Sequence, residues 1–204
     1  MSILRTCLLI ISLALTGLIQ TAYAVTETDT LNAVLASRSD EDKVRDDARQ
    51  PLETLTFFQI KPGMTIAEAL PGGGWYTRIL ANYLGQDGTL YGVNYPDSLW
   101  PMLSYASPKW IAERIAATQN FTAKVATFTD NGIIAKGFTF DTVPPEVEGT
   151  VDRVLLIRAL HNLNRFQQKA GTRSQALAAT HAMLKKDGLV GVVQHRAPAT
   201  VSEE

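Results

Sequence analysis

The fold is decided by residues 64–84, which read MTIAEALPGGGWYTRILANYL. Met64 to Ala69 is a short apolar run interrupted by Glu68, which is typical of a buried strand. Pro71-Gly72-Gly73-Gly74 then predicts a turn. The following segment predicts a helix with one apolar face, ended by Gly85 in the left-handed conformation; that face carries Trp75, Tyr76, Ile79, Leu80, Tyr83 and Leu84.

Similar units recur along the chain. Ser107-Pro108 predicts a helix start, with serine as the N-cap and proline at the first helical position. A later helix is predicted from about Arg173 to Leu184. Two segments compete for the third strand, and the pattern leaves both open: Lys124–Phe128 and Gly137–Phe140. The other predicted strands are Thr89–Val93, Val151–Ile157 and Leu189–Gln194. Apolar strands joined by crossover helices predict an α/β fold with a parallel sheet covered on both faces.

The first 24 residues have the pattern of a secretory signal peptide. Arg5 precedes an apolar run from Cys7 to Ile19, and Ala22-Tyr23-Ala24 offers a small-x-small cleavage site. The apolar run is too short for a transmembrane helix, so we expect cleavage after Ala24 and no stable membrane insertion afterwards. Cys7 is the only cysteine in the sequence. A mature chain without cysteine suits an oxidising compartment, and a periplasmic or secreted protein is expected.

Residues 25–59 are predicted to form an N-terminal helical cap, followed by one α/β domain over residues 60–204. Within the cap, Ser39 and Asp42 resemble a capping box. Arg45, Asp46 and Arg49 allow two interpretations: a solvated helix face, or a lid over a ligand site with Arg49 pointing inward.

Composition excludes several classes of partner and site. The formal net charge of −1 gives no electrostatic reason to expect binding to nucleic acid. The histidines are His161, His181 and His195, and their spacing matches no metal-ligand pattern. With no cysteine in the mature chain to assist them, no metal site is expected.

The glycine turn is the best candidate for a small-molecule site, because ligands of open parallel sheets bind beyond the carboxyl ends of the strands. A nicotinamide fingerprint fits poorly, since Thr77 takes the place of its third glycine and Asn94 the place of its acidic residue. No Gly-Lys-Ser/Thr tripeptide of a phosphate-binding loop occurs.

Four segments together resemble the class I S-adenosylmethionine-dependent methyltransferases: residues 66–77, Gly88–Asn94, Asp152–Ile157 and Leu184–Val190. With the signal peptide, the Arg45-Asp46-x-x-Arg49-x-Pro51 segment and His161-Asn162, the chain resembles an exported bacterial group of predicted methyltransferases. The resemblance implies a Rossmann-like three-layer αβα sandwich with a mainly parallel sheet. That fold usually has a sixth and a seventh strand, and this sequence stops after the fifth, so we expect either a shortened version of the fold or an incomplete reading frame.

The resemblance further implies that S-adenosylmethionine is the cofactor. Its methionine end would be held by Glu68 and by the turn, which comprises Leu70, Pro71, Gly72, Gly73 and Gly74. Asn94 and Tyr95 would reach the ribose, and Asp141 would contact the adenine. Two residues depart from the family pattern: Leu70 stands where the first glycine usually lies, and Asn94 replaces the acid that binds the ribose hydroxyls.

His161 and Asn162 follow the fourth predicted strand, and His195 follows the fifth, so all should reach the same edge of the sheet. A neutral imidazole accepts a proton near pH 7, which makes His161, with Asn162, the candidate catalytic group. The alternative is a histidine that caps a helix or binds a loop carbonyl.

The expected function is methyl transfer to an unknown small-molecule or exported substrate. The alternative is a non-catalytic, methyltransferase-like periplasmic binding or interaction protein, and a nicotinamide oxidoreductase is a weaker third interpretation. The oligomeric state is not indicated by the sequence.

Overall fold

The computed structural model describes residues 27–196, so the predicted signal peptide and the last eight residues lie outside the described part. Contacts divide the chain into two compact units, one ending at Gln59 and one beginning at Ile60. In the part of the chain that the structure describes, no helix is long and apolar enough to cross a membrane.

The first unit is helical. A helix over residues 27–37 is followed by α2 (Asp40–Lys43), α3 (Asp46–Arg49) and α4 (Pro51–Phe57). The Ser39 hydroxyl accepts a hydrogen bond from the Asp42 amide, as the capping pattern predicts. Arg38 is buried and pairs with Asp46 at 2.5 Å, which ties the start of α3 to the end of the first helix.

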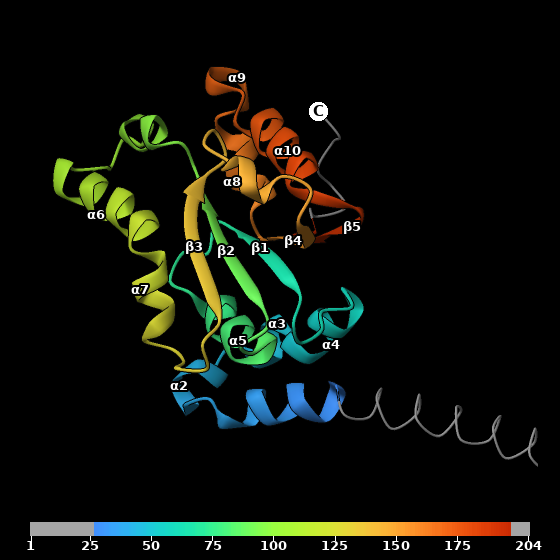
Figure 1. Cartoon of the computed structure of the whole chain (residues 1–204). Helices are drawn as coiled ribbons and strands as arrows, with labels where there is room; N and C mark the ends of the chain where they lie inside the picture. The colour runs from blue at the N-terminus through green and yellow to red at the C-terminus, as the bar shows by residue number, and fades with distance from the viewer. Residues whose placement is uncertain (1–26, 197–204) are drawn as a thin grey trace, which may run out of the picture. The chain divides into compact units, whose positions relative to one another are not determined.

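The second unit is built on a parallel sheet of five strands within the described residues, in the order β3-β2-β1-β4-β5. Figure 1 shows the strands side by side with the helices around them. This arrangement confirms the predicted α/β, Rossmann-like fold. The strands are β1 (Thr65–Ala69), β2 (Thr89–Asn94), β3 (Ile134–Thr139), β4 (Val151–Ile157) and β5 (Leu184–Val193).

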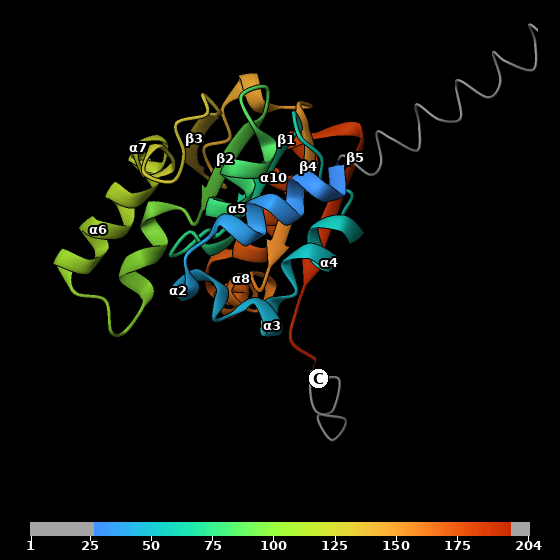
Figure 2. The same cartoon turned by 90° about the horizontal axis from the view of Figure 1, so that it is seen from below.

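Helices connect these strands. Between β1 and β2 lies α5 (Trp75–Leu84), and between β2 and β3 lie η1 (Asp97–Met102), α6 (Pro108–Gln119) and α7 (Phe121–Ala126). Between β3 and β4 there is only the short η2 (Pro145–Val147). Between β4 and β5 lie α8 (Leu160–Arg165), α9 (Gln167–Ala170) and α10 (Thr172–Met183). Figure 2 shows the same arrangement from below.

Alternation along the strands divides the interior into two layers. Ala67, Ala69 and Val93 face a core that also contains Ala176 and Met183 of α10. The intervening residues of β1 point to the opposite face, where the carboxylate of Glu68 meets Thr77 of α5. The sheet is therefore packed between helices, as continuous apolar strands require.

The region before β3 settles the two alternatives for the third strand. Gly137–Phe140 largely coincides with β3, whereas the prediction of a strand at Lys124–Phe128 is wrong. Most of that segment belongs to α7, which buries Phe121 and Val125 at helical spacing. A short apolar run of this length does not distinguish the two structures.

Two glycines let the α6–α7 connection lie directly on the sheet. A Cβ atom at Gly92 of β2 would lie 2.4 Å from the ring of Phe121, and one at Gly137 of β3 would lie 2.0 Å from the Thr118 carbonyl oxygen. Both distances are far below contact distance, so only glycine allows this approach.

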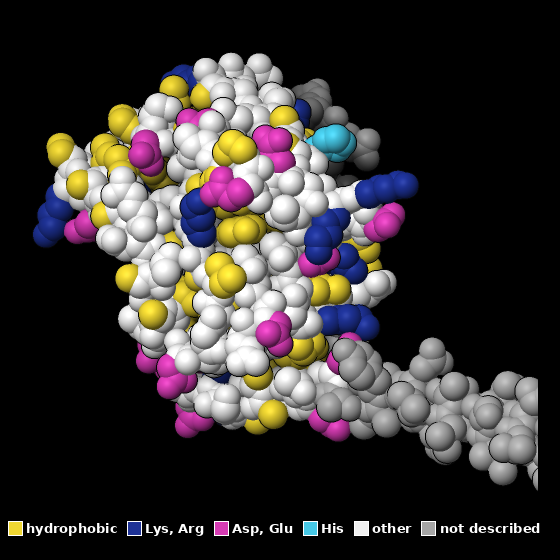
Figure 3. All heavy atoms as spheres, in the orientation of Figure 1, with side chains coloured by type: hydrophobic (Ala, Val, Ile, Leu, Met, Phe, Trp, Pro, Cys, Tyr) yellow, Lys and Arg dark blue, Asp and Glu magenta, His cyan; other side chains and the backbone are white. Residues whose placement is uncertain are grey.

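The last strand differs from the prediction in two respects. It begins at Leu184 rather than Leu189, so residues 185–188 are part of an irregular strand that shifts register opposite Val151 and Arg153. Its outer part is also not fully covered, because Leu189, Val190 and Val192 are each more than 40% exposed. In Figure 3 basic side chains gather along this edge, where the strand also exposes Lys185 and Lys186.

The end of α5 also departs from the prediction. Gly85 has φ 71° and ψ −173°, so it ends α5 with a positive φ but outside the left-handed helical region.

Candidate functional site

A cavity of about 270 Å³ lies at the carboxyl end of the sheet, close to the lower end of the ~300–1,000 Å³ typical of small-molecule pockets. It lies where β1, β2 and β4 end, and the strand order reverses between β1 and β4. This is the position that parallel sheets offer to ligands. The lining residues are Leu70, Pro71, Gly72, Asn94, Tyr95, Trp100, Leu103, Tyr105, Trp110, Arg114, Ala117, Phe121, Lys124, Asn162, Arg165 and Phe166.

The turn after β1 forms one wall of the cavity and has an unusual backbone. Leu70 has φ 53°, in the left-handed region that L-residues with a Cβ atom disfavour. Its amide donates to the Val93 carbonyl at 2.8 Å, which holds the residue at the end of the sheet. Gly72 and Gly74 also have positive φ, at 55° and 86°. Leu70 therefore stands where the family pattern has glycine and adopts a backbone conformation typical of glycine.

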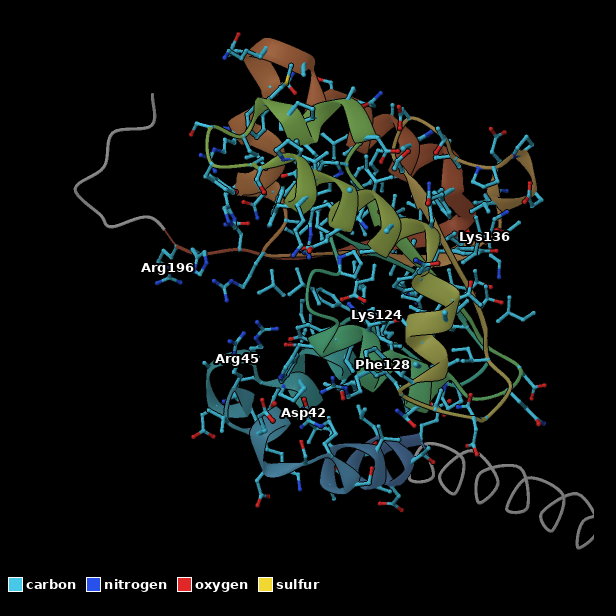
Figure 4. All side chains as sticks on the ribbon, turned by 90° about the vertical axis from the view of Figure 1, so that its left-hand side faces the viewer. Asp42, Arg45, Lys124, Phe128, Lys136 and Arg196 are labelled. Atoms are coloured by element: carbon cyan, nitrogen blue, oxygen red, sulfur yellow. The ribbon has the colours of Figure 1, made fainter. Side chains whose placement is uncertain are left out.

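Lys124 of α7 is bound to this turn. Its ammonium donates to the Gly72 carbonyl at 2.9 Å, and its Cε atom would lie 3.1 Å from a Cβ atom at Gly74. Figure 4 looks onto α6 and α7 and labels Lys124 and Phe128, which flank the start of α5. Burial lowers the pKa of the Lys124 ammonium, an effect that Arg114 and Arg78 increase and the nearby Glu68 opposes.

Glu68 does not line the cavity. It is 5% exposed, next to the last residue of β1, and its carboxylate accepts a hydrogen bond of 2.6 Å from the Thr77 hydroxyl. The carboxylate therefore joins β1 to the first turn of α5, immediately behind the glycine turn.

Asn94 and Tyr95, the predicted ribose contacts, both line the cavity at the end of β2. The Asn94 amide donates to the Thr118 hydroxyl at 2.9 Å, so it is oriented by α6. Burial raises the pKa of the Tyr95 hydroxyl, with a smaller opposing effect from Arg165. Tyr95 is therefore protonated at any physiological pH.

Aromatic side chains form a second wall of the cavity, and sequence reasoning identified only Tyr95 among them as a site residue. Tyr95 packs edge-on against Trp100 at 5.3 Å, Trp100 against Trp110 at 5.7 Å, and Trp110 against Tyr105 at 5.8 Å. The available signal was an aromatic residue at every fifth position from 95 to 110. Only the folding of η1 and α6 around the cavity makes these residues one surface.

The polar lining is basic. Arg114, Lys124 and Arg165 line the cavity, and none of the described lining residues is acidic. Arg114 lies 5.3 Å from the centre of the Trp110 ring, and Arg165 lies 5.6 Å from that of Phe166. Both cations are thus held against aromatic faces of the wall.

The predicted catalytic pair is divided by the structure. Asn162 lines the cavity, whereas His161 is exposed and outside the lining, with Nδ1 3.0 Å from the Gln194 amide nitrogen. The rings of His161 and His195 lie 5.7 Å apart, so the two histidines meet at one edge of the sheet. This edge also holds Arg158, whose Nε donates to His195.

The remaining predicted residues, Gly73, Gly74 and Asp141, do not line the cavity. Gly73 is exposed in the turn, and Gly74 is buried beneath Lys124. Asp141 is exposed just past β3 and accepts a short hydrogen bond from the Thr139 hydroxyl. Among residues 27–196 no group of three or more His, Cys, Asp or Glu side chains is arranged to hold a metal ion.

No family model matches the sequence, and no curated protein matches it. In structure, the chain is similar to a SAM-dependent methyltransferase from Aquifex aeolicus, with 17% identity, 76% of this chain and 67% of that chain covered, and a TM-score of 0.43. It is also similar to phosphoethanolamine N-methyltransferase 2 from Haemonchus contortus in complex with S-adenosylhomocysteine, with 18% identity, coverage of 76% and 30%, and a TM-score of 0.44. A third similar structure is the cyclase SpnF, with 14% identity, coverage of 72% and 44%, and a TM-score of 0.43. One fold hosts several chemistries, so the activity of this chain has to be inferred from its own site.

Proposed function

We propose that this protein is an S-adenosylmethionine-dependent methyltransferase that acts on a small molecule. The observation that carries the proposal is the composition of one cavity, in which the glycine turn after β1 and the end of β2 at Asn94 and Tyr95 line the same space. These are the segments whose sequences resemble the cofactor-binding motifs of the class I family.

The turn fits such a ligand. A Cβ atom at Gly73 would meet nothing within 4 Å, and one at Gly72 would meet only the Leu70 carbonyl at 3.8 Å. The backbone there is open to a molecule placed alongside it. The turn and Lys124 would hold the amino-acid end of the cofactor, and Asn94 would hydrogen-bond to its ribose. Once bound, the cofactor supplies an electrophilic methyl group on a sulfonium.

The chain's own contribution is positioning and exclusion of water. The aromatic wall lines the cavity together with the turn, and α8, which follows β4, supplies the Asn162 amide. Holding two reactants in one water-poor space raises their effective concentration, which is a large part of the catalysis of a displacement reaction.

Titration calorimetry of the purified protein with S-adenosylmethionine and S-adenosylhomocysteine tests the proposal. We expect binding of both, and loss of at least about tenfold in affinity in Gly72→Ala, because a methyl group enters the ligand-facing turn. Gly149→Ala is the matched control: Gly149 also has a positive φ, at 66°, and open space around it, but lies in the turn before β4. Both variants carry the same backbone strain, and only Gly72→Ala should lose affinity. Absence of heat at millimolar ligand, or equal affinities in the two variants, would contradict the proposal.

A second function, ligand binding without turnover, is favoured by Leu70. Its side chain lines the cavity at the position where the family pattern has glycine. Formation of S-adenosylhomocysteine separates the two functions: a methyltransferase releases it when an acceptor is supplied, whereas a binding protein retains intact S-adenosylmethionine.

We also propose that the protein is exported and begins at Val25 after cleavage. The pattern of residues 1–24 supports this proposal. Mass spectrometry of the protein recovered from a periplasmic fraction gives the test, since an intact Met1 would contradict cleavage.

A further inference from the structure

The charge of the cavity lining is strongly one-sided. Arg114 comes from α6, Lys124 from α7 and Arg165 from α8, so three separate helices each direct a cation to the same space. Arg114 is close enough to Lys124 to depress its pKa, and Arg165 is close enough to Tyr95 to favour the phenolate. Like charges placed together repel unless an anion joins them.

Two buried donors at the cavity have no acceptor in the described residues. They are the Nε atom of Arg114 and the Nε1 atom of Trp100, a side chain that is only 8% exposed. A buried donor without an acceptor costs roughly 1–3 kcal/mol, so native proteins seldom leave one in place without a ligand or water. Trp100 and Arg114 both line the cavity, and the Arg114 guanidinium lies 5.3 Å from the centre of the Trp110 ring.

The aromatic residues of the cavity indicate that the ligand also contains a planar ring. Tyr95, Trp100, Trp110 and Tyr105 pack in successive edge-on contacts, and Phe166 adds a ring beside Arg165. Rings in this arrangement offer apolar faces and edges to a planar partner.

We infer that the methyl acceptor is a small aromatic anion, such as an aromatic carboxylate, whose charged group is held by Arg114 and Arg165 and whose ring lies against the Trp100–Trp110 wall. This inference rests on the proposed function, because it divides the cavity between a cofactor at the turn and an acceptor at the wall.

The positive charge of the cofactor also favours an anionic acceptor in the same cavity. S-adenosylmethionine carries a sulfonium, and a cationic lining repels it. An anion bound between Arg114 and Arg165 removes that repulsion, so each ligand should favour the other. S-adenosylhomocysteine has a neutral thioether in the same place and should gain less. In the reaction a lone pair of one carboxylate oxygen of the acceptor would form the new O–C bond while the C–S bond breaks with its electron pair left on sulfur. The products are a neutral methyl ester and a neutral thioether, so no proton has to leave.

Calorimetry with 2-naphthoate as the probe, and with neutral 2-naphthamide as its isostere, tests the inference. We expect 2-naphthoate to bind at least about tenfold more tightly than 2-naphthamide, as one charge-assisted hydrogen bond provides. Arg114→Gln and Arg165→Gln should each remove most of that preference. Lys109→Gln on α6 and Lys169→Gln on α9 are the matched controls, because each removes one exposed positive charge outside the cavity lining and should leave the preference unchanged. Thermal melts of all four variants confirm that they fold.

Coupling provides the second measurement. Saturating 2-naphthoate should raise the affinity for S-adenosylmethionine at least about fivefold, and more than it raises that for S-adenosylhomocysteine. If S-adenosylmethionine binds but the two naphthyl probes bind equally, the acceptor class is wrong and the proposed function stands. If 2-naphthoate binds through both arginines but S-adenosylmethionine does not, the proposed function fails and the aromatic-anion site stands. If both arginine variants behave as their lysine controls, the inference is overturned.

Discussion

The left-handed conformation of Leu70 predicts an unusual order of stability between two variants. Leu70 has φ 53° and is half-buried, packed against the hydrophobic core of the second unit. Leu70→Ala removes the side chain but keeps the backbone strain, whereas Leu70→Gly removes both. Glycine should therefore be the less damaging replacement, the opposite of the usual order in regular structure.

The magnitude follows from opposing terms. A residue with a Cβ atom in the left-handed region costs roughly 1–2 kcal/mol, which glycine relieves. Against this, glycine loses about 0.4–1 kcal/mol relative to alanine through the greater freedom of its unfolded chain. We expect Leu70→Gly to be about 0.5–1 kcal/mol more stable than Leu70→Ala, with both below the wild type because side-chain packing is lost.

Urea unfolding followed by tryptophan fluorescence measures this difference, since Trp75, Trp100 and Trp110 all belong to the unit from Ile60 onward. Leu160 provides the matched pair: it is half-buried against the same core at the start of α8 and has no positive φ. There the glycine variant should be less stable than the alanine variant by about 1 kcal/mol. If Leu70→Gly is also the less stable of its pair, then Leu70 is not strained and the reasoning fails.

Three further predictions concern the same unit. Burial lowers the pKa of Lys124, so on raising the pH the folded chain releases this proton at a lower pH than the unfolded chain does. The free energy of unfolding of the wild type, relative to that of Lys124→Met, should therefore rise from neutral pH to about pH 10. A difference that does not change with pH would contradict this prediction. Thr77→Val removes the donor to a buried carboxylate of β1 and should cost about 1–3 kcal/mol in urea unfolding, whereas Thr180→Val, which removes a buried hydroxyl without a described partner, should be neutral or stabilising. Ser107→Ala removes the N-cap of α6 and should cost about 1 kcal/mol; Ser104→Ala, at an exposed position before the helix, should cost less than half of that.

Much of the fold could be predicted because local signals agree with it. Val151–Ile157 coincides with β4, and Ser107-Pro108 begins α6, because an apolar run and an N-cap depend on few residues close in sequence. The third strand remained open because a five-residue apolar run suits either a strand or a buried helix face. Only packing on Gly92 and Gly137 decides in favour of the helix α7.

The candidate site could be predicted only in part, for a similar reason. The turn from Leu70 to Gly72 follows β1 directly, and Asn94 and Tyr95 lie at the end of the neighbouring strand β2, so strand order brings them together. Arg114, Lys124 and Arg165 come from three helices, and no local pattern indicates that their side chains share one space. His161 was predicted from its place after β4, but a position after a strand does not fix the direction of a side chain.

The two glycines beneath the α6–α7 connection have a consequence for how the set of ligands that the cavity accepts could change. Gly92 and Gly137 do not line the cavity, yet they set how low the helices carrying Arg114 and Lys124 lie. A single methyl group at either glycine would lift those helices and widen the space without altering one lining residue. Natural variants with a broader or narrower ligand preference should therefore be sought at the sheet glycines Gly92 and Gly137 as well as among the residues that line the cavity.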